Sequence, residues 1–127
     1  MSSSTLFNKI GGQNTVNQAV DIFYRKILLD NRINHFFLDI DMNKQIQKQK
    51  GFLTLALGEP NHYTGKTLRE GHAHLVKRGL SDQHVDYVLE HLTQSLIELG
   101  VTATDIAEVI AIANQVRDEV LNRGPND

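Results

Sequence analysis

The chain has 127 residues, with 13 Lys and Arg against 15 Asp and Glu, and a formal net charge of −2. This length predicts one domain over residues 1–127 with a core of its own, with residues 1–4 and 124–127 as frayed ends. Cysteine is absent, which excludes disulfides and thiolate metal sites. No signal-peptide pattern, no run of 18 apolar residues and no dense basic patch occurs. We therefore expect a cytoplasmic protein without a membrane span or a nucleic-acid partner.

Apolar residues recur at intervals of three and four along most of the chain, as in amphipathic helices. The predicted helical segments run from Gly12 to near Asp30, then over residues 33–38, 41–57, 66–77, 82–99 and 104–121. Asp41 and Ser81 are expected to cap their helices, and Thr104 to begin the last one. The fold class is therefore all-α, and the last two helices are expected to form an antiparallel pair at the centre.

The segment 41–57 carries polar residues where an apolar stripe is expected. Gln45, Lys48, Gln49 and Phe52 share one helical face, and Gln49 also lies on the inward stripe. A buried amide without a partner costs about 1–3 kcal/mol, so one possibility is a polar group facing this stripe. The other is that Gln45 and Lys48 are solvated and Gln49 bonds to backbone, and on spacing alone this is the more common arrangement.

Tyr24 and the histidines are the remaining residues that do not fit a plain core. Tyr24 lies on or beside an apolar stripe, where a buried hydroxyl usually finds a partner. The six histidines include no HExxH motif and no His-x3-His pair, so a structural zinc site is unsupported. Spacing does not distinguish His72 from His74 or His84. The residues alone therefore predict a helical domain with a polar cluster in its core, and no particular cofactor.

Five stretches, in order and at matching spacing, resemble the group I truncated haemoglobins over about residues 5–121. They are the sequences at 6–12, 20–24, 32–42, 52–60 and 63–72. The resemblance implies a two-over-two helical sandwich, in which helices B and E pack on G and H and the F helix is short. It also implies a b-type haem.

The resemblance also assigns roles to particular residues. It makes His72 the proximal iron ligand and Tyr24 the distal tyrosine. The distal side would be lined by Gln45, Lys48 and Gln49. The macrocycle would contact Phe37, Phe52, Leu53, Leu68 and Val88. Lys44 and Lys66 would bind the propionates, because basic side chains at a rim suit exposed carboxylates.

Three positions depart from the family pattern. Gly58-Glu59 replaces a glycine pair after the E helix. Lys48 stands where some cyanobacterial members carry an iron-binding histidine. Val116 stands at about the position of a histidine that attaches the haem covalently in some members, and no histidine follows His91. We therefore expect non-covalent haem b.

A haem with one imidazole ligand leaves a position for O2, CO or NO. Tyr24 and a glutamine would hold O2 tightly, which predicts an O2-binding protein, expected to be monomeric. The alternative is NO dioxygenation, in which Tyr24 and Gln49 would assist catalysis and a separate reductase would restore the iron. A third possibility is a haem-free helical interaction module. Lys48 is expected to reach a propionate or solvent, although deprotonated Lys48 or Tyr24 is a possible sixth ligand.

Overall fold

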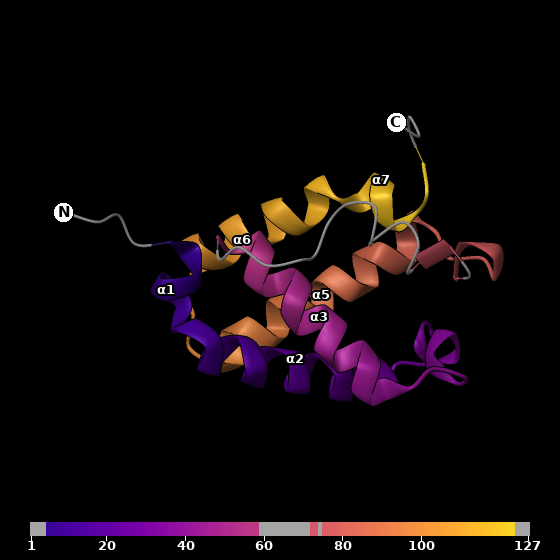
Figure 1. The fold of residues 1–127 in the computed structure, drawn as a ribbon, viewed down its shortest axis with the longest axis horizontal. Helices are drawn as coiled ribbons and strands as arrows, with labels where there is room; N and C mark the ends of the chain where they lie inside the picture. The colour runs from indigo at the N-terminus through magenta and orange to yellow at the C-terminus, as the bar shows by residue number, and fades with distance from the viewer. Residues whose placement is uncertain (1–4, 59–71, 74, 124–127) are drawn as a thin grey trace.

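The computed structural model describes residues 5–58, 72, 73 and 75–123, and all regular structure in these residues is helical (Figure 1). The chain begins with α1 (Leu6–Ile10) and α2 (Gly12–Leu28). Gly11 between them has φ +120°, and a Cβ at this position would lie 2.1 Å from the Thr15 hydroxyl oxygen. The sharp turn that sets α1 against the start of α2 therefore requires glycine.

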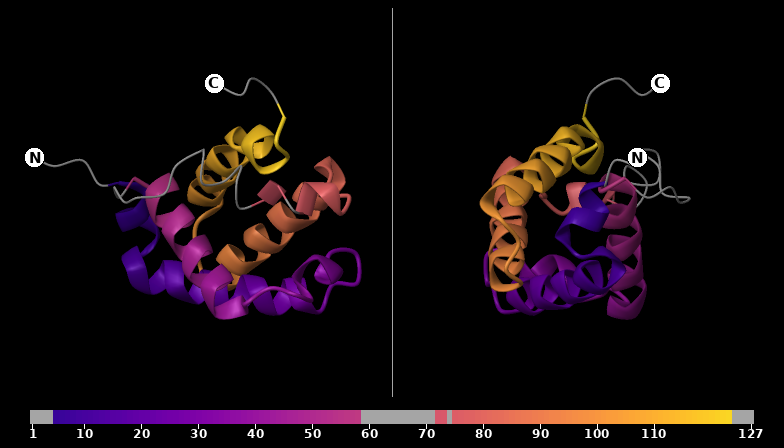
Figure 2. Two further views of the ribbon diagram at one scale, coloured as in Figure 1. Left: turned by 45° about the vertical axis from the view of Figure 1, so that its right-hand side comes forward. Right: turned by 90° about the vertical axis from the view of Figure 1, so that its left-hand side faces the viewer.

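Four helices form two layers around the core. α2 and α3 (Met42–Ala56) form one pair, and α5 (Asp82–Glu98) and α6 (Ala103–Gln115) form the other. α2 packs against both α3 and α5, and α5 packs against α6. In the right-hand view of Figure 2, α3 lies on one side of the molecule, α5 and α6 on the other, and α2 crosses between them. This arrangement is the predicted two-over-two sandwich.

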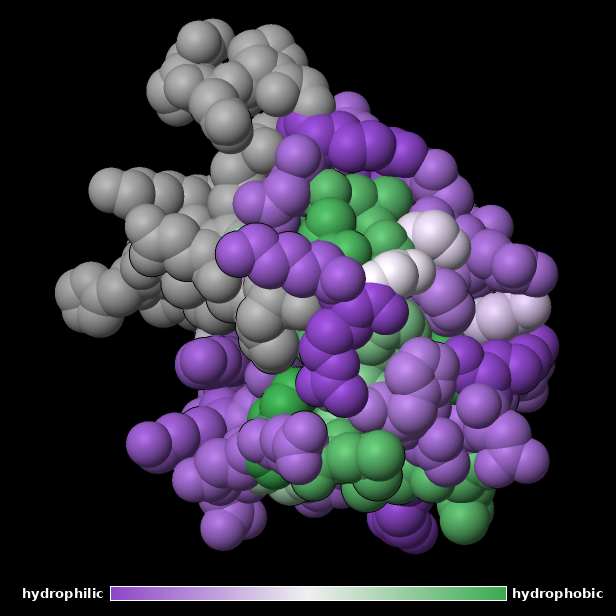
Figure 3. Space-filling view, turned by 90° about the vertical axis from the view of Figure 1, so that its right-hand side faces the viewer, coloured by the Kyte–Doolittle hydropathy of each residue, from purple (hydrophilic) through white to green (hydrophobic). Residues whose placement is uncertain are grey.

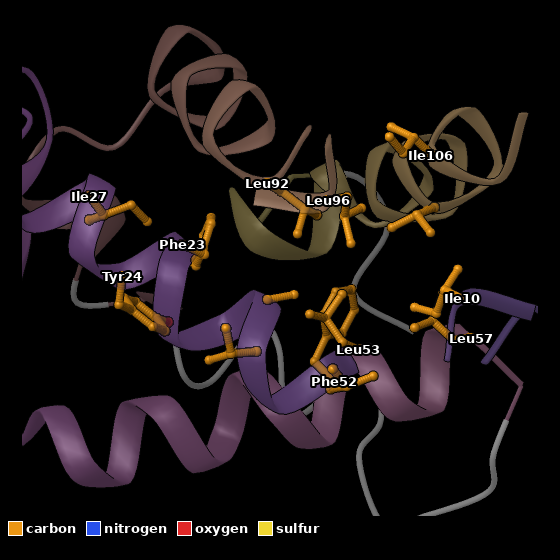
Figure 4. Packing of buried hydrophobic residues seen from close by; sticks show 14 of the residues in the cluster. Ile10, Phe23, Tyr24, Ile27, Phe52, Leu53, Leu57, Leu92, Leu96 and Ile106 are labelled. Atoms are coloured by element: carbon orange, nitrogen blue, oxygen red, sulfur yellow. The ribbon is translucent and has the colours of Figure 1, made fainter. Parts of the chain in front are cut away.

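The core lies where the two layers meet. α2 contributes a stripe of fully buried side chains at helical spacing, such as Val16, Val20 and Ile27. Figure 4 shows Phe23 of α2 together with residues of α3 and α5, among them Leu53 and Leu96, directed into the space between the helices. Each of these helices therefore buries an apolar stripe, as the sequence pattern predicted.

Asp41 and Ser81 begin their helices as predicted. The backbone N–H groups of Asn43 and Lys44 donate to Asp41 Oδ1 at 3.1 and 3.3 Å, so this carboxylate caps α3. Ser81 is the N-cap of α5, and its backbone N–H donates to Nδ1 of His84 at 3.0 Å.

The prediction for the last helix is wrong at its start and in its middle. Thr102, not Thr104, is the N-cap of α6, because its hydroxyl accepts the N–H of Asp105 at 3.2 Å. The helix also stops at Val116 and restarts as the short α7 (Arg117–Val120). Of the predicted segment 66–77, residues 72, 73 and 75–77 are described and are helical. The predicted frayed ends, 1–4 and 124–127, lie outside the described residues.

Within the described part of the chain, no helix combines the length and the apolar character needed to cross a membrane.

Candidate functional site

A cavity lies between the two layers and is walled by residues from every helix that surrounds it. Its space amounts to about 920 Å³, including the part open to solvent. The wall is mainly aliphatic and aromatic, and four phenylalanines contribute to it: Phe23, Phe36, Phe37 and Phe52. Figure 3 shows the face of the molecule that lies at the right in Figure 1. On this face, apolar residues are visible between hydrophilic ones. The cavity therefore suits a mostly apolar molecule.

The polar part of the wall comes from α2 and α3. Tyr24 is 4% exposed, and its hydroxyl accepts a hydrogen bond of 3.1 Å from Nε2 of Gln45. Gln49, one turn after Gln45 on α3, lies on the same wall. The Tyr24 ring packs edge-on against Phe37 at 5.9 Å between centroids, which fixes its orientation. Tyr24 and two amides thus lie together in a cavity whose wall is mainly apolar.

His72 is half-buried and also lines this cavity. It belongs to the helical segment that contains Leu75, which is buried in the core and lines the cavity as well. No other histidine of the described residues lines the cavity. An imidazole on the wall of an apolar cavity is suited to bind a metal ion inside it.

The short helix η1 (Asn34–Phe37) brings Phe36 and Phe37 to the cavity, and Asp30 anchors the turn that precedes it. Asp30 accepts hydrogen bonds from the Arg32 guanidinium at 2.7–3.1 Å and is 2.7 Å from Nε2 of His91 on α5. The hydrogen bonds from Arg32 are the main cause of an Asp30 pKa well below its usual range; burial opposes this shift and His91 adds to it. A charged cluster therefore fastens this turn to α5.

His84 holds the other side of η1. Its ring packs edge-on against Phe36 at 4.9 Å between centroids. Burial lowers the pKa of His84, and the nearby His35 lowers it further. Both effects favour the neutral imidazole, in which Nδ1 can accept the Ser81 backbone N–H.

Comparison with known proteins identifies the family. The family model described as bacterial-like globin matches residues 5–122. The group 1 truncated haemoglobin of Synechocystis is 47% identical over 123 residues, which cover 94% of this chain and 99% of that protein. The chain belongs to the group 1 truncated haemoglobins.

Solved structures of truncated haemoglobins agree with this. The 2/2 haemoglobin of a Synechococcus species, solved in the cyanomet state with covalently attached haem, has a TM-score of 0.88 at 43% identity, covering 94% of this chain and 100% of that one. The truncated haemoglobin of Tetrahymena pyriformis, in its Fe(III) form, has a TM-score of 0.85 at 41% identity, covering 93% of this chain and 98% of that one. Membership of this family implies a haem cofactor and binding of small gaseous ligands.

The chemistry of the cavity fits a haem. The wall combines aromatic and aliphatic contacts for a macrocycle, one imidazole for the iron and a cluster of hydrogen-bonding side chains. Within the described residues, no three His, Cys, Asp or Glu side chains gather to hold a metal ion directly.

The structure places the residues named for the site in three groups. Seven line the cavity: Tyr24, Phe37, Gln45, Gln49, Phe52, His72 and Val88. Leu53 is buried in the core, while Lys44 and Lys48 are exposed on α3, and none of these three is among the cavity-lining residues. Lys66 and Leu68 lie outside the described residues. The roles of all of these residues remain predictions.

Several wall residues were not predicted, and Arg117 is the most unusual. It lies on the wall at the break between α6 and α7, and its guanidinium bonds to Asp86 at 2.7 Å and Asp82 at 3.1 Å on α5. These hydrogen bonds, first of all the one that Arg117 donates to Asp86, raise the pKa of Arg117. Phe36 was the other notable omission, although its neighbour Phe37 was named.

Proposed function

We propose that this chain binds a non-covalent haem b in the cavity, with His72 as the proximal ligand, and that it binds O2 reversibly. The observation that supports this most directly is that His72 and the Tyr24–Gln45 hydrogen bond belong to the walls of one cavity. When bound, the haem would supply an iron that takes up a diatomic gas. His72 would supply the iron ligand, and Tyr24 and Gln49 would supply hydrogen-bond donors.

The direction of the Tyr24–Gln45 hydrogen bond decides which groups can donate to a gas ligand. The Gln45 amide donates to the Tyr24 oxygen, so the phenolic O–H is oriented away from Gln45. Gln49 adds an amide from the next turn of α3. Bound O2 carries partial negative charge, which donors in a low-dielectric cavity stabilise. Tight O2 binding with slow release therefore follows from these three residues.

The haem is held without a covalent bond to the protein. The chain has no cysteine, which excludes thioether links, and no histidine after His91. Val116, rather than a histidine, lines the cavity at the end of α6.

Replacing His72 tests the assignment. Purified wild-type protein supplied with haemin is expected to show a Soret band, and His72→Gly should lose the haem or release it much faster. Added imidazole should restore the spectrum by filling the space of the missing ring. His74→Ala is the matched control, because His74 is the alternative ligand two residues away. Loss of haem from the His74 variant and retention by the His72 variant would contradict the proposal.

A further inference from the structure

The outer surface of α3 has an unusual charge. Residues 42–58 contain three lysines and no carboxylate, although the whole chain is net negative. Lys44 and Lys48 are exposed one helical turn apart, with Asn43 and Gln47 exposed beside them. We call these four residues the lysine face.

The lysines of α3 have no acidic partner within the described residues. Neither Lys44, Lys48 nor Lys50 forms an ion pair there. The carboxylate nearest in sequence, Asp41, accepts backbone N–H groups at the start of the helix. Like charges at i and i+4 destabilise a helix by about 0.2–0.5 kcal/mol per pair. Lys44 and Lys48 therefore weaken α3 slightly, and both side chains are exposed to solvent.

A polar groove adjoins the lysine face. It is open to solvent and lies between the first half of α2 and α3, and its residues are Gln13, Asn17, Gln47, Lys50, Gly51 and Thr54. Lys50 and the amides offer hydrogen-bond donors, and Gly51 leaves the helix backbone without a side chain at this point. Donors and cations together suit the carboxylates of a protein surface.

The opposite side of the molecule is acidic. Residues 82–123 carry eight carboxylates and two arginines, and they form α5, α6 and α7. α3 lies across the molecule from α5 and α6 (Figure 2). This charge separation orients the protein so that the lysine face meets an acidic partner, and it raises the rate at which the two proteins associate.

The inner side of α3 explains what such a partner would do. Gln45, Gln49 and Phe52 of this helix form part of the cavity wall. A protein on the lysine face is therefore separated from the cavity by roughly the 10–12 Å diameter of one helix.

We propose that the lysine face is the docking site of an acidic electron-transfer protein, which passes one electron to ferric haem iron. This inference rests on the proposed haem function, because O2 binds only to ferrous iron. In the transfer the donor protein loses one electron and the iron gains it, and no bond forms or breaks.

Stopped-flow reduction of the ferric protein tests the proposal, with reduced flavodoxin, an acidic FMN protein, as the donor. Photoreduced lumiflavin, a small flavin without a protein, is the reference donor. At low salt, Lys44→Glu with Lys48→Glu should slow reduction by flavodoxin about tenfold and remove its salt dependence. The ratio of the flavodoxin rate to the lumiflavin rate cancels any change in the haem pocket itself. Lys9→Glu with Lys77→Glu, which changes the net charge equally at exposed positions outside α3, should change this ratio less than about threefold.

Two further measurements keep the test decisive if the double variant loads haem poorly. Gln47→Lys adds a cation to the lysine face and should accelerate reduction by flavodoxin, which damage to the fold cannot do. Unlabelled flavodoxin should shift the amide NMR signals of residues 43–48 in the ¹⁵N-labelled protein. Equal slowing in the Lys9 and Lys77 variant, shifts confined to α5–α7, or binding of phosphatidylserine vesicles in place of flavodoxin would overturn the proposal. A protein without a Soret band would refute the haem function, while the NMR titration would still test the surface.

Discussion

Tyr24 is the residue on which O2 release should depend most strongly. Its hydroxyl is buried and its oxygen is already bonded to Gln45, so Tyr24→Phe removes an ordered donor. A hydrogen bond to a charged partner contributes about 1.5–3 kcal/mol, and 1.4 kcal/mol corresponds to about tenfold. We expect O2 to dissociate roughly ten- to a hundredfold faster from Tyr24→Phe, measured by stopped-flow displacement with CO. Gln49→Leu should act in the same direction.

Tyr87→Phe is the matched control for this measurement. Tyr87 lies on α5, and the Cζ atom of Arg32 is 3.7 Å from the centroid of the Tyr87 ring. Tyr87 is not among the described residues that line the cavity. Its O2 release should equal that of the wild type. An unchanged off-rate in both Tyr24→Phe and Gln49→Leu would show that the distal side of the cavity lies elsewhere.

Lys48 tests whether a surface lysine reaches the iron. Its side chain is exposed and does not line the cavity, which supports solvation of the ammonium rather than ligation. The resting ferric spectrum of Lys48→Ala should therefore match that of the wild type. A low-spin wild-type spectrum that becomes high-spin in Lys48→Ala would show that the lysine enters the cavity and binds.

At the scale of elements, the Asp30 cluster determines where η1 and its phenylalanines lie. Asp30→Asn should destabilise the fold by about 1–3 kcal/mol, because Arg32 and His91 lose a charged acceptor. The folded-state pKa of Asp30 is depressed. Its stabilising effect is therefore complete above the unfolded pKa of about 3.9 and is lost as the pH falls toward the folded value.

Urea unfolding between pH 3 and pH 6 measures this effect. The difference in unfolding free energy between wild type and Asp30→Asn should be constant near pH 6 and should shrink below about pH 4. Asp39→Asn, at an exposed carboxylate before α3, is the control and should show little difference at any pH. A difference that grows on acidification would mean that Asp30 is not held as a carboxylate by this cluster.

The helices were largely predictable because their stripes have the helical period, whereas their ends depend on local and tertiary bonds. Thr102 and Thr104 are both capable caps, and the choice between them rests on the hydrogen bond from Asp105. The break at Val116 was not predictable, since the apolar pattern continues through it. Arg117, just beyond the break, bonds to α5, a contact that periodicity along one helix does not reveal.

The site was predictable only with the family resemblance. Spacing alone left His72 equivalent to other histidines and favoured a solvated Gln45, whereas the structure pairs Gln45 with Tyr24 across two helices. Lys44 and Lys48 were assigned to the pocket, but a long side chain on α3 can turn either way, and both are exposed. The arrangement that spacing did not favour, a polar group facing α3, is the one found for Gln45, and that group is the Tyr24 hydroxyl.

For the whole molecule, we expect stability to depend on the cofactor. The cavity between the two layers is lined by apolar residues of both α2 and α5, among them Phe23, Ile27 and Leu92. A ligand that binds only the folded state stabilises it by about 4 kcal/mol at a thousandfold excess over its Kd. For a chain of this size that corresponds to roughly 10–20 °C in Tm.

We therefore expect haem removal to lower Tm by roughly this amount in scanning calorimetry, with recovery after haemin is added back. His72→Gly should show the lower Tm even with haemin present, and imidazole should raise it again, because the iron ligand couples binding to stability. His74→Ala should melt like the wild type. Equal melting with and without haem would mean that the two layers close on themselves, and that the cavity contributes nothing to haem binding. A rise in Tm that requires both haemin and His72 would show that haem binding through His72 is coupled to the folding of the two helical layers.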